Sequence, residues 1–174
     1  NAINANIKSV YMVFNQGTTK SVFDHIGGGR EWHLDSVDSR YFIHFYQDFL
    51  KKKAEGRPYF ESVIDYLNKS KSEYTVFMGN RMLCNIDLEA VLKIHQQSDS
   101  VMTVVYKKMP KEQIYRQDEI LEVDEHGIIA GHHNFLEEKT NEEVLNLGMK
   151  IFICRTDWLI NALQEGQNLG GPVA

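Results

Sequence analysis

Four short runs of apolar residues punctuate the chain and predict buried β-strands. They are rich in β-branched and aromatic side chains, and polar residues or glycine follow each one. The runs are Ser9–Phe14, Tyr74–Met78, Ser100–Tyr106 and Leu145–Ile153. Near-continuous apolar character is typical of strands that are covered on both faces, so the pattern favours parallel pairing in one sheet.

Between these runs, apolar residues recur at helical spacing. Phe60, Val63, Ile64 and Leu67 lie at i, i+3, i+4 and i+7, and Pro58 suits the first turn of that helix. Further helices are expected from Thr18 or Thr19 through His25, from an N-cap at Asp87 through His95, and from Thr156 to Gly166. Strands that alternate with helices predict an α/β fold with a mainly parallel mixed sheet and helices on both faces.

Two glycine-containing segments predict turns between these elements. Gly27-Gly28-Gly29-Arg30 has the composition of a phosphate loop, but it follows a predicted helix, so a helix C-cap is favoured. Ile120–Val123, Asp124–Gly127 and Ile128–Ala130 read as strand, turn and strand, which predicts an antiparallel hairpin.

The amino-acid composition argues against nucleic-acid-binding and membrane-spanning proteins. The 174 residues fit one domain spanning 1–174, with 43% hydrophobic and 25% charged residues. A net charge of −5 argues against a nucleic-acid partner, and no apolar run is long enough for a membrane span. Cys84 and Cys154 are far apart, which indicates reduced thiols in a cytoplasmic protein.

The adjacent histidines do not indicate a metal site, and the chain ends indicate truncation. His132 and His133 are adjacent, and neighbouring side chains on an extended segment point to opposite faces, so we predict no metal site. Asn1-Ala2 has the character of a cloning remnant, and the tail from Gly170 to Ala174 stops without a structural reason. We therefore expect a fragment truncated at both ends.

The segment from Glu73 to Asp87 resembles a known family. It is similar to the Ser-Gly-Asp-His-x-Tyr-x-Met-Asp segment of glucose-1-phosphate adenylyltransferase, also called ADP-glucose pyrophosphorylase. Gly79 and Asp87 match, and Asn80 stands where the family carries an Asp that holds Mg²⁺. The resemblance implies that no catalytic residue is intact at this strand end. Asp87 is open to two interpretations, a surviving metal ligand or a helix N-cap, and the N-cap is favoured.

Two stretches nearer the N-terminus extend the resemblance. Asn15–Ile26 is similar to the family's Thr-Gln-Tyr-Lys-Ser-x-Ser-Leu-x-x-His-Leu, and it matches at Gln16, which implies a nucleotide-binding role for Gln16 together with Gly79. Gly17 and Thr18 replace the Tyr and Lys of that motif. Gly56–Val63 stands where the family has Gly-Thr-Ala-x-Ala, so bulky residues replace small ones at a ligand-facing position.

Two stretches nearer the C-terminus carry the sugar-phosphate side of the resemblance. Asn134–Thr140 is similar to Phe-x-Glu-Lys-Pro if one residue is inserted, which aligns Glu138 and Lys139. Leu145–Ile153 is similar to Ser-Met-Gly-Ile-Tyr-x-Phe and matches at Gly148. The resemblance implies sugar-phosphate binding by Glu138, Lys139 and Gly148. Each has an ordinary alternative: Lys139 as a solvated loop residue, and Gly148 as a β-bulge.

Together these features imply a truncated nucleotide-diphospho-sugar transferase (Rossmann-like) fold. The family joins ATP and glucose 1-phosphate into ADP-glucose and pyrophosphate with Mg²⁺, in glycogen biosynthesis. The departures imply a regulatory-type subunit with a degenerate site, inactive alone, with no bound cofactor and with a catalytic subunit as partner. ATP, glucose 1-phosphate or sugar-phosphate effectors are candidate ligands. Two alternatives stay open, a catalytically active enzyme of the family and a sugar-phosphate binding module.

Overall fold

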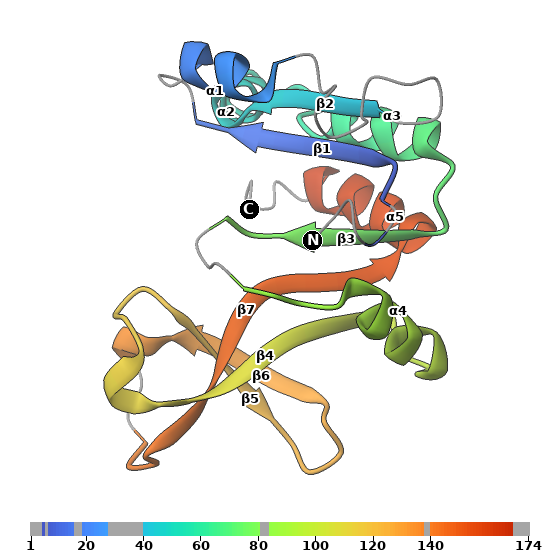
Figure 1. Ribbon diagram of the computed structural model, residues 1–174. Helices are drawn as coiled ribbons and strands as arrows, with labels where there is room; N and C mark the ends of the chain where they lie inside the picture. Colours follow the sequence, from blue (N-terminus) through green and yellow to red (C-terminus); the bar gives the residue numbers. More distant parts are fainter. Residues whose placement is uncertain are drawn as a thin grey trace. The chain divides into compact units, whose positions relative to one another are not determined.

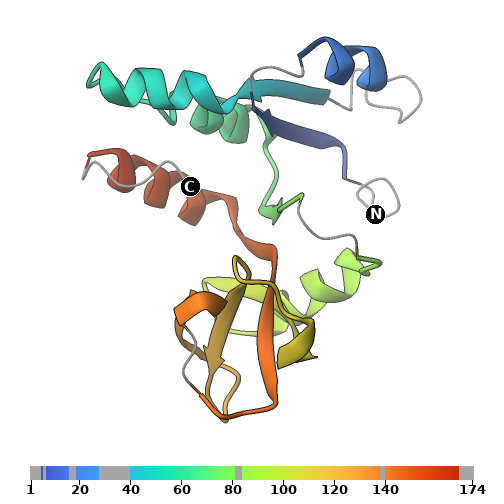
Figure 2. The same cartoon turned by 90° about the vertical axis from the view of Figure 1, so that its left-hand side faces the viewer.

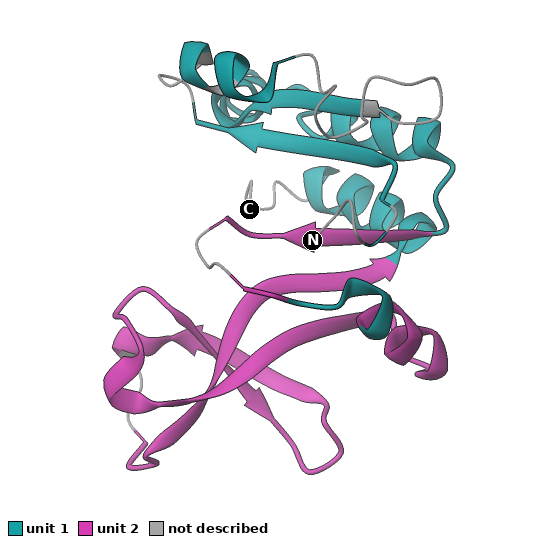
Figure 3. Ribbon diagram, in the orientation of Figure 1, with its two compact units in different colours: residues 1–73, 86–90, 155–174 teal, residues 74–85, 91–154 magenta. Residues whose placement is uncertain are grey.

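The computed structural model describes residues 5, 7–15, 19–27, 40–80, 84–137 and 140–168 (Figure 1). The chain divides into two compact units, which are drawn in different colours in Figure 3. The first unit comprises residues 1–73, 86–90 and 155–174, and the second comprises residues 74–85 and 91–154. Each unit is described by itself below.

The first unit contains a two-stranded parallel sheet. Strand β1 (Ser9–Phe14) pairs with β2 (Arg40–Phe45), in a register that runs from Ser9 opposite Arg40 to Phe14 opposite Phe45. Its helices are α1 (Thr19–Ile26), α2 (Tyr46–Ala54), α3 (Glu61–Ser70) and α5 (Thr156–Asn168). β2 runs directly into α2, as Figure 2 shows.

An aromatic cluster forms the core of the first unit. Phe49 and Tyr59 are buried, and the partly buried hydrophobic side chains packed against them include Tyr11 and Phe60. Tyr11 also lies against Tyr66, with ring centroids 5.0 Å apart. These contacts join β1, α2 and α3 through large side chains that have few rotamers to lose, so the cluster fixes how the helices pack on the sheet.

The second unit is built around one long strand. Strand β7 (Val144–Arg155) begins in this unit, and the described part of the sheet has the order β3-β7-β5-β6, with β4 also paired to β7. The other elements are α4 (Leu88–Gln97), which ends in this unit, β3 (Tyr74–Met78), β4 (Met102–Pro110), β5 (Glu119–Val123), β6 (Ile129–Asn134) and the short 3₁₀ turns η2 (Lys111–Gln113) and η3 (Phe135–Glu137).

The structure is α/β with a mixed set of strands, but the prediction of a mainly parallel sheet is wrong. β7 pairs antiparallel with β4 and β5, and β5 pairs antiparallel with β6. Gly79 donates its N–H to Lys150 and Thr156 donates to Glu73, so β3 and β7 also run in opposite directions. The apolar runs report burial, whereas the direction of pairing depends on how the chain connects the strands, as in the tight turn between β5 and β6.

The expectation that all four apolar runs share one sheet is also only partly met. β3, β4 and β7 belong to the five-stranded sheet, whereas β1 pairs with β2 and, within the described ranges, with no strand of that sheet. The second strand, β2, comes from the aromatic stretch that starts at Arg40. An apolar run shows that a segment is suited to a sheet, and leaves its partner undetermined.

Several predicted ends of elements are confirmed. Gly27 follows α1 with φ at +56° and donates its N–H to Phe23 at 2.8 Å, as a C-cap does; residues 28–30 lie outside the described ranges. Asp87 accepts the N–H of Ala90 at 3.1 Å and caps α4. Two ends differ. α3 begins at Glu61, beyond Pro58, and α5 continues through Gly166 to Asn168.

Candidate ligand site at the end of strand β3

The carboxyl end of β3 lies hard against β7. The backbone N–H of Gly79 donates to the carbonyl oxygen of Lys150 at 2.7 Å. A Cβ atom added at Gly79 would lie 2.7 Å from the Cβ of Lys150, closer than real Cβ atoms approach. Glycine at 79 is therefore required by a contact within the protein. That contact places the side chain of Lys150 beside the strand end.

Lys150 itself adopts an unusual backbone conformation. Its φ is +54°, in the left-handed region that non-glycine residues rarely occupy. The cause is a β-bulge in β7: Val105 of β4 lies opposite Ile151, but Tyr106 lies opposite Gly148, which leaves Met149 and Lys150 without partners in β4. Bulges of this kind redirect a side chain and often occur beside functional sites.

The redirected Lys150 side chain reaches a carboxylate on the neighbouring strand. Its ammonium group pairs with Glu119 at the start of β5, and the other oxygen of Glu119 lies 2.8 Å from Nδ1 of His132 on β6. The side chain of Lys150 is 40% exposed and that of Glu119 is 23% exposed. The first side-chain carbons of Lys150 thus pack on the end of β3, while its half-exposed ammonium group is held by Glu119 on β5.

Gly148 is buried just before the bulge. Two interpretations of it follow from the sequence, a sugar-phosphate-binding residue or a β-bulge. A Cβ atom there would lie 3.4 Å from the carbonyl oxygen of Glu119 and 3.5 Å from Cγ of Leu121. These contacts are within the protein and explain the glycine without a ligand. The bulge interpretation is therefore confirmed in the sense that the irregularity begins directly after Gly148.

Asn80 follows Gly79 and is exposed to solvent. It offers one neutral amide, with an oxygen that accepts and an NH₂ group that donates. A Mg²⁺ ion needs several hard oxygen ligands, whereas Asn80 brings no negative charge and Glu119 is already paired with Lys150 and His132. These residues do not fit Mg²⁺. Within the described ranges no group of three or more His, Cys, Asp and Glu residues could hold a metal ion.

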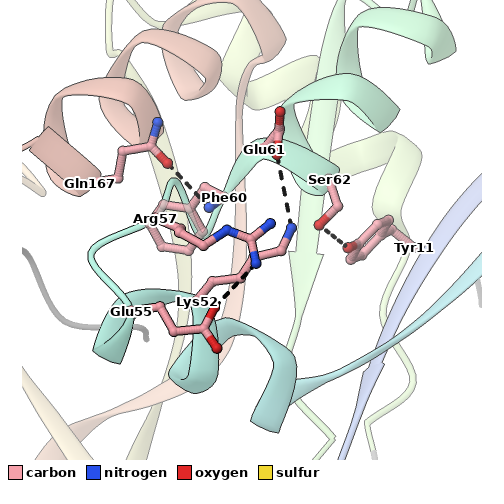
Figure 4. Close-up of polar contacts among 8 residues, drawn as sticks. All are labelled: Tyr11, Lys52, Glu55, Arg57, Phe60, Glu61, Ser62 and Gln167. Carbon is pink, nitrogen blue, oxygen red and sulfur yellow. Dashed lines mark hydrogen bonds and ion pairs between the residues drawn. The ribbon is translucent and has the colours of Figure 1, made fainter.

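The loop before α3, where the resemblance expects small residues, carries large side chains, of which Figure 4 shows Arg57 and Phe60. Tyr59 is 3% exposed and its hydroxyl donates to the carbonyl of Gly166 at 3.4 Å. The N–H of Phe60 donates to Oε1 of Gln167 at 3.2 Å. Arg57 pairs with Glu55 at 3.1 Å. Tyr59 and Phe60 are structural parts of the first unit, because they join the loop before α3 to the last turn of α5.

A shallow hollow of about 420 Å³ lies over β5, β6 and the start of β7. Its polar lining includes Glu122 and His133, which lie 3.2 Å apart, and Asn146, whose amide donates to the carbonyl of Leu121 at 3.2 Å. In the resemblance of Leu145–Ile153 to Ser-Met-Gly-Ile-Tyr-x-Phe, Asn146 aligns with the Ser. The Asn146 amide is hydrogen-bonded between β7 and β5. The hollow therefore marks the place where these two strands meet, and the amide has a structural role.

Three of the residues assigned from the resemblance lie outside the described ranges, namely Gln16, Glu138 and Lys139. Their roles stay predictions. Gly79 meets Lys150 in the β7 bulge, and Gly148 lies directly before that bulge and meets Glu119 and Leu121 of β5. Sequence reasoning missed Lys150 and Glu119, and it considered His132 only as a metal ligand. The available signal was the glycine at 148, which had suggested a bulge that would redirect the residues after it.

Two further groups are buried and have no solvent-facing chemistry. His95, expected at the edge of the core, is 3% exposed and its Nδ1 lies 2.9 Å from the hydroxyl of Thr103. Cys154 is fully buried, and burial raises the pKa of its thiol to about 11. None of the helices in the described part of the chain has the length and hydrophobicity that a bilayer-spanning segment needs.

Two of the curated proteins that match the chain are named for glycogen biosynthesis. The chain is 30% identical over 161 residues to the glycogen biosynthesis protein GlgD of Bacillus subtilis (strain 168), a match that covers 88% of this chain. It is 28% identical over 135 residues to the protein of the same name from Geobacillus stearothermophilus, covering 76% of this chain. No family model matches. The matches span 44% and 38% of these relatives, less than half of each. Over most of its own length, the chain is therefore similar to proteins named for glycogen biosynthesis.

Proposed function

We propose that the chain is part of a regulatory-type subunit of glucose-1-phosphate adenylyltransferase and acts in glycogen biosynthesis in the cytoplasm. In this proposal it has a nucleotide-diphospho-sugar transferase fold and associates with a catalytic subunit of the same family. The catalytic subunit converts ATP and glucose 1-phosphate into ADP-glucose and pyrophosphate. The subunit described here contributes to regulation and leaves the metal-dependent chemistry to its partner.

One observation carries the proposal, the replacement of a metal-binding carboxylate at the end of β3. Asn80 stands at that position, and the neighbouring Gly79 packs against the first side-chain carbons of Lys150. An amide at this position supplies an oxygen ligand without the negative charge that a divalent metal ion favours. The similarity to two glycogen biosynthesis proteins supports the pathway.

The runner-up, an active enzyme of the same family, is disfavoured by a second feature. Tyr59 and Phe60 stand where small residues would let substrate approach, and Tyr59 is part of the buried cluster around Phe49. Opening that position would dismantle the core of the first unit. A catalytic role would therefore need two separate changes, a carboxylate at position 80 in the second unit and small residues at positions 59 and 60 in the first.

The test is reconstitution with the full-length protein. ADP-glucose formation is measured for the catalytic subunit alone, for this protein alone and for the mixture, after co-purification of the two. We expect no activity from this protein alone, a stable complex, and altered maximal rate or effector response in the mixture. Activity of this protein alone at a rate similar to that of the catalytic subunit would overturn the proposal.

A further inference from the structure

The end of β3 and the start of β5 lie along the same edge of β7. β4 pairs with β7 from Val144 to Cys154, so it occupies the opposite edge over that length. On the edge that remains, the N–H of Gly79 bonds to Lys150, and Ile120 of β5 lies opposite Leu147. Lys150 is therefore situated where β7 passes from one of these neighbours to the other.

Lys150 contacts both neighbours, β3 through its first side-chain carbon and β5 through its ammonium group. We propose that Lys150 is the positioning residue of a conformational relay, through which a displacement at the end of β3 reaches the β5–β6 hairpin. The members of the relay all belong to the second unit, drawn in magenta in Figure 3, and are Gly79, Lys150, Glu119 and His132. The coupling is a property of that unit by itself, whereas its use in regulation rests on the proposed function.

The first step of the relay is the contact between Gly79 and Lys150. Their backbones share a hydrogen bond of 2.7 Å, and the Cβ of Lys150 lies 2.7 Å from the position of a Cβ at 79. No free space separates the two residues. A displacement of the strand end toward β7 must therefore move residue 150.

The second step is a change of backbone conformation at Lys150. Its φ is +54°, within the bulge that leaves it and Met149 without partners in β4. A non-glycine residue keeps a left-handed conformation only where its surroundings enforce it, and the hydrogen bond from Gly79 is one such restraint. Residue 150 therefore has two conformations available, the left-handed one and the extended one that is usual in strands.

The third step is the release of Glu119. The Lys150 ammonium pairs with this carboxylate, whose other oxygen lies 2.8 Å from Nδ1 of His132 on β6. A rotation of the backbone at residue 150 changes the direction of its side chain, so the ammonium leaves Glu119 when the bulge relaxes. The carboxylate that joins β5 to β6 then loses one of these two partners.

The hairpin depends on this contact because its backbone pairing with β7 is short. In the part of the chain that the structure describes, β5 and β7 share one register pair, Ile120 opposite Leu147. The Asn146 amide adds a hydrogen bond of 3.2 Å to the carbonyl of Leu121. Among the described strands, β6 pairs with β5 alone. Loss of the contact between Lys150 and Glu119 is therefore expected to loosen β5 and β6 together.

The experiment is hydrogen–deuterium exchange of the full chain, read by mass spectrometry in peptides that cover the hairpin, residues 119–134. Gly79→Ala displaces the Cβ of Lys150, and we expect exchange in the hairpin to rise about two- to thirtyfold, the range of coupling through connected contacts. Lys150→Met removes the ammonium group and is expected to raise hairpin exchange within the same range.

A double-mutant cycle separates the relay from a general loss of stability. Lys150→Gly removes both the Cβ that an alanine at 79 would meet and the ammonium group. In that background, Gly79→Ala is expected to add nothing to hairpin exchange. The control is Thr103→Val, which removes the hydrogen-bond partner of His95 in the same unit and contacts no member of the relay. It is expected to leave hairpin exchange unchanged.

The relay must also work in reverse, because coupling between two sites is reciprocal. Glu119→Gln keeps the shape of the side chain and removes the charge that holds Lys150. We expect it to raise the exchange of the peptide that contains the Gly79 amide. A Glu119 side chain that only stabilised the hairpin would leave that peptide unchanged.

Additive effects of Gly79→Ala and Lys150→Gly would overturn the inference, as would an equal rise of hairpin exchange in Thr103→Val. Either result leaves the proposed function in place, because reconstitution with the catalytic subunit is a separate readout. Conversely, a coupled hairpin in a protein that forms no complex with that subunit would retain the relay and remove the proposed function. Circular dichroism confirms that each variant is folded, and if Gly79→Ala does not fold, Lys150→Met and Glu119→Gln decide the outcome.

Discussion

Gly79 and Lys150 are in contact in two ways. Their backbones share a hydrogen bond, and the Cβ of Lys150 occupies the space that a side chain at position 79 would need. The N–H of Gly79 donates to the carbonyl of Lys150 at 2.7 Å, and the Lys150 Cβ lies 2.7 Å from the position of a Cβ at 79. Lys150 is itself held in the left-handed region. The backbone of Gly79 and the bulge at Lys150 leave no room for a side chain between them. This contact therefore couples the end of β3 to the shape of β7.

Gly79→Ala tests that contact. The new methyl group must displace the first carbon of Lys150, so we expect a loss of about 1–3 kcal/mol in the free energy of unfolding. The control is Gly166→Ala in α5, where no atom lies within 4 Å of the added Cβ. That change should be neutral or stabilise by up to about 1 kcal/mol. Urea denaturation measures both, and equal stabilities for the two variants would show that the β3 end is more open than described.

Tyr59→Ala tests whether the bulky residues before α3 are structural. Tyr59 is 3% exposed and packs against Phe49, so truncation should cost about 3–5 kcal/mol. Leu50→Ala is the control, because Leu50 is 45% exposed on the same helix as Phe49 and should change stability little. Thermal melts compare the two. A Tyr59→Ala variant as stable as the unaltered protein would indicate that this position can become small, as an active relative requires.

Much of the fold could be predicted from the sequence because the signals were local. The helix starting near Thr19, the cap at Asp87 and the hairpin turn at Asp124–Gly127 each depend on residues within one or two turns. Asp124, for example, accepts the N–H of Ile128 at 2.8 Å, which is a contact within five residues. Local chemistry of this kind is fixed before the chain packs.

The pairing of strands and the surroundings of the site were not predicted, because they depend on contacts between distant segments. Lys150 meets Gly79 and Glu119, which lie 71 and 31 residues away along the chain, and no spacing rule joins these three. The apolar runs also gave no direction for β3, β4 and β7. The resemblance identified the position of Asn80, and the structure supplied the packing of the adjacent Gly79 against Lys150.

Cys154 predicts a loss of stability at high pH. Burial raises the pKa of this thiol from its ordinary value of 9.0 to about 11, so between these values the folded state keeps a proton that the unfolded state releases. Stability therefore falls as pH rises through this window, by at most about 3 kcal/mol. Urea denaturation of Cys154→Ala, compared with the unaltered protein between pH 8 and about 11, measures the effect. A cysteine variant whose pH dependence in this window matches that of the unaltered protein would rule out this thiol as the cause.

The link between His95 and Thr103 predicts strong coupling in the core of the second unit. His95 is buried, and its ring also lies against Tyr74 with centroids 5.7 Å apart. Thr103→Val removes the hydroxyl and leaves a buried ring nitrogen without that partner, at a cost of about 1–3 kcal/mol. In a double-mutant cycle with His95→Leu, the combined loss should be smaller than the sum of the two single losses. Additive losses would mean that the 2.9 Å contact contributes nothing.

The most direct test of the central claim, that the end of β3 has lost its metal ligand, is a Mn²⁺ titration monitored by electron paramagnetic resonance. It compares the full-length protein with its Asn80→Asp variant, each in complex with the catalytic subunit. Asn80→Asp should add a weak site, because it restores one anionic oxygen ligand, and the unaltered protein should show only the metal bound by its partner. A Mn²⁺ site of the unaltered protein that is abolished by Asn80→Ala would contradict the account, since Asn80 would then be a working metal ligand.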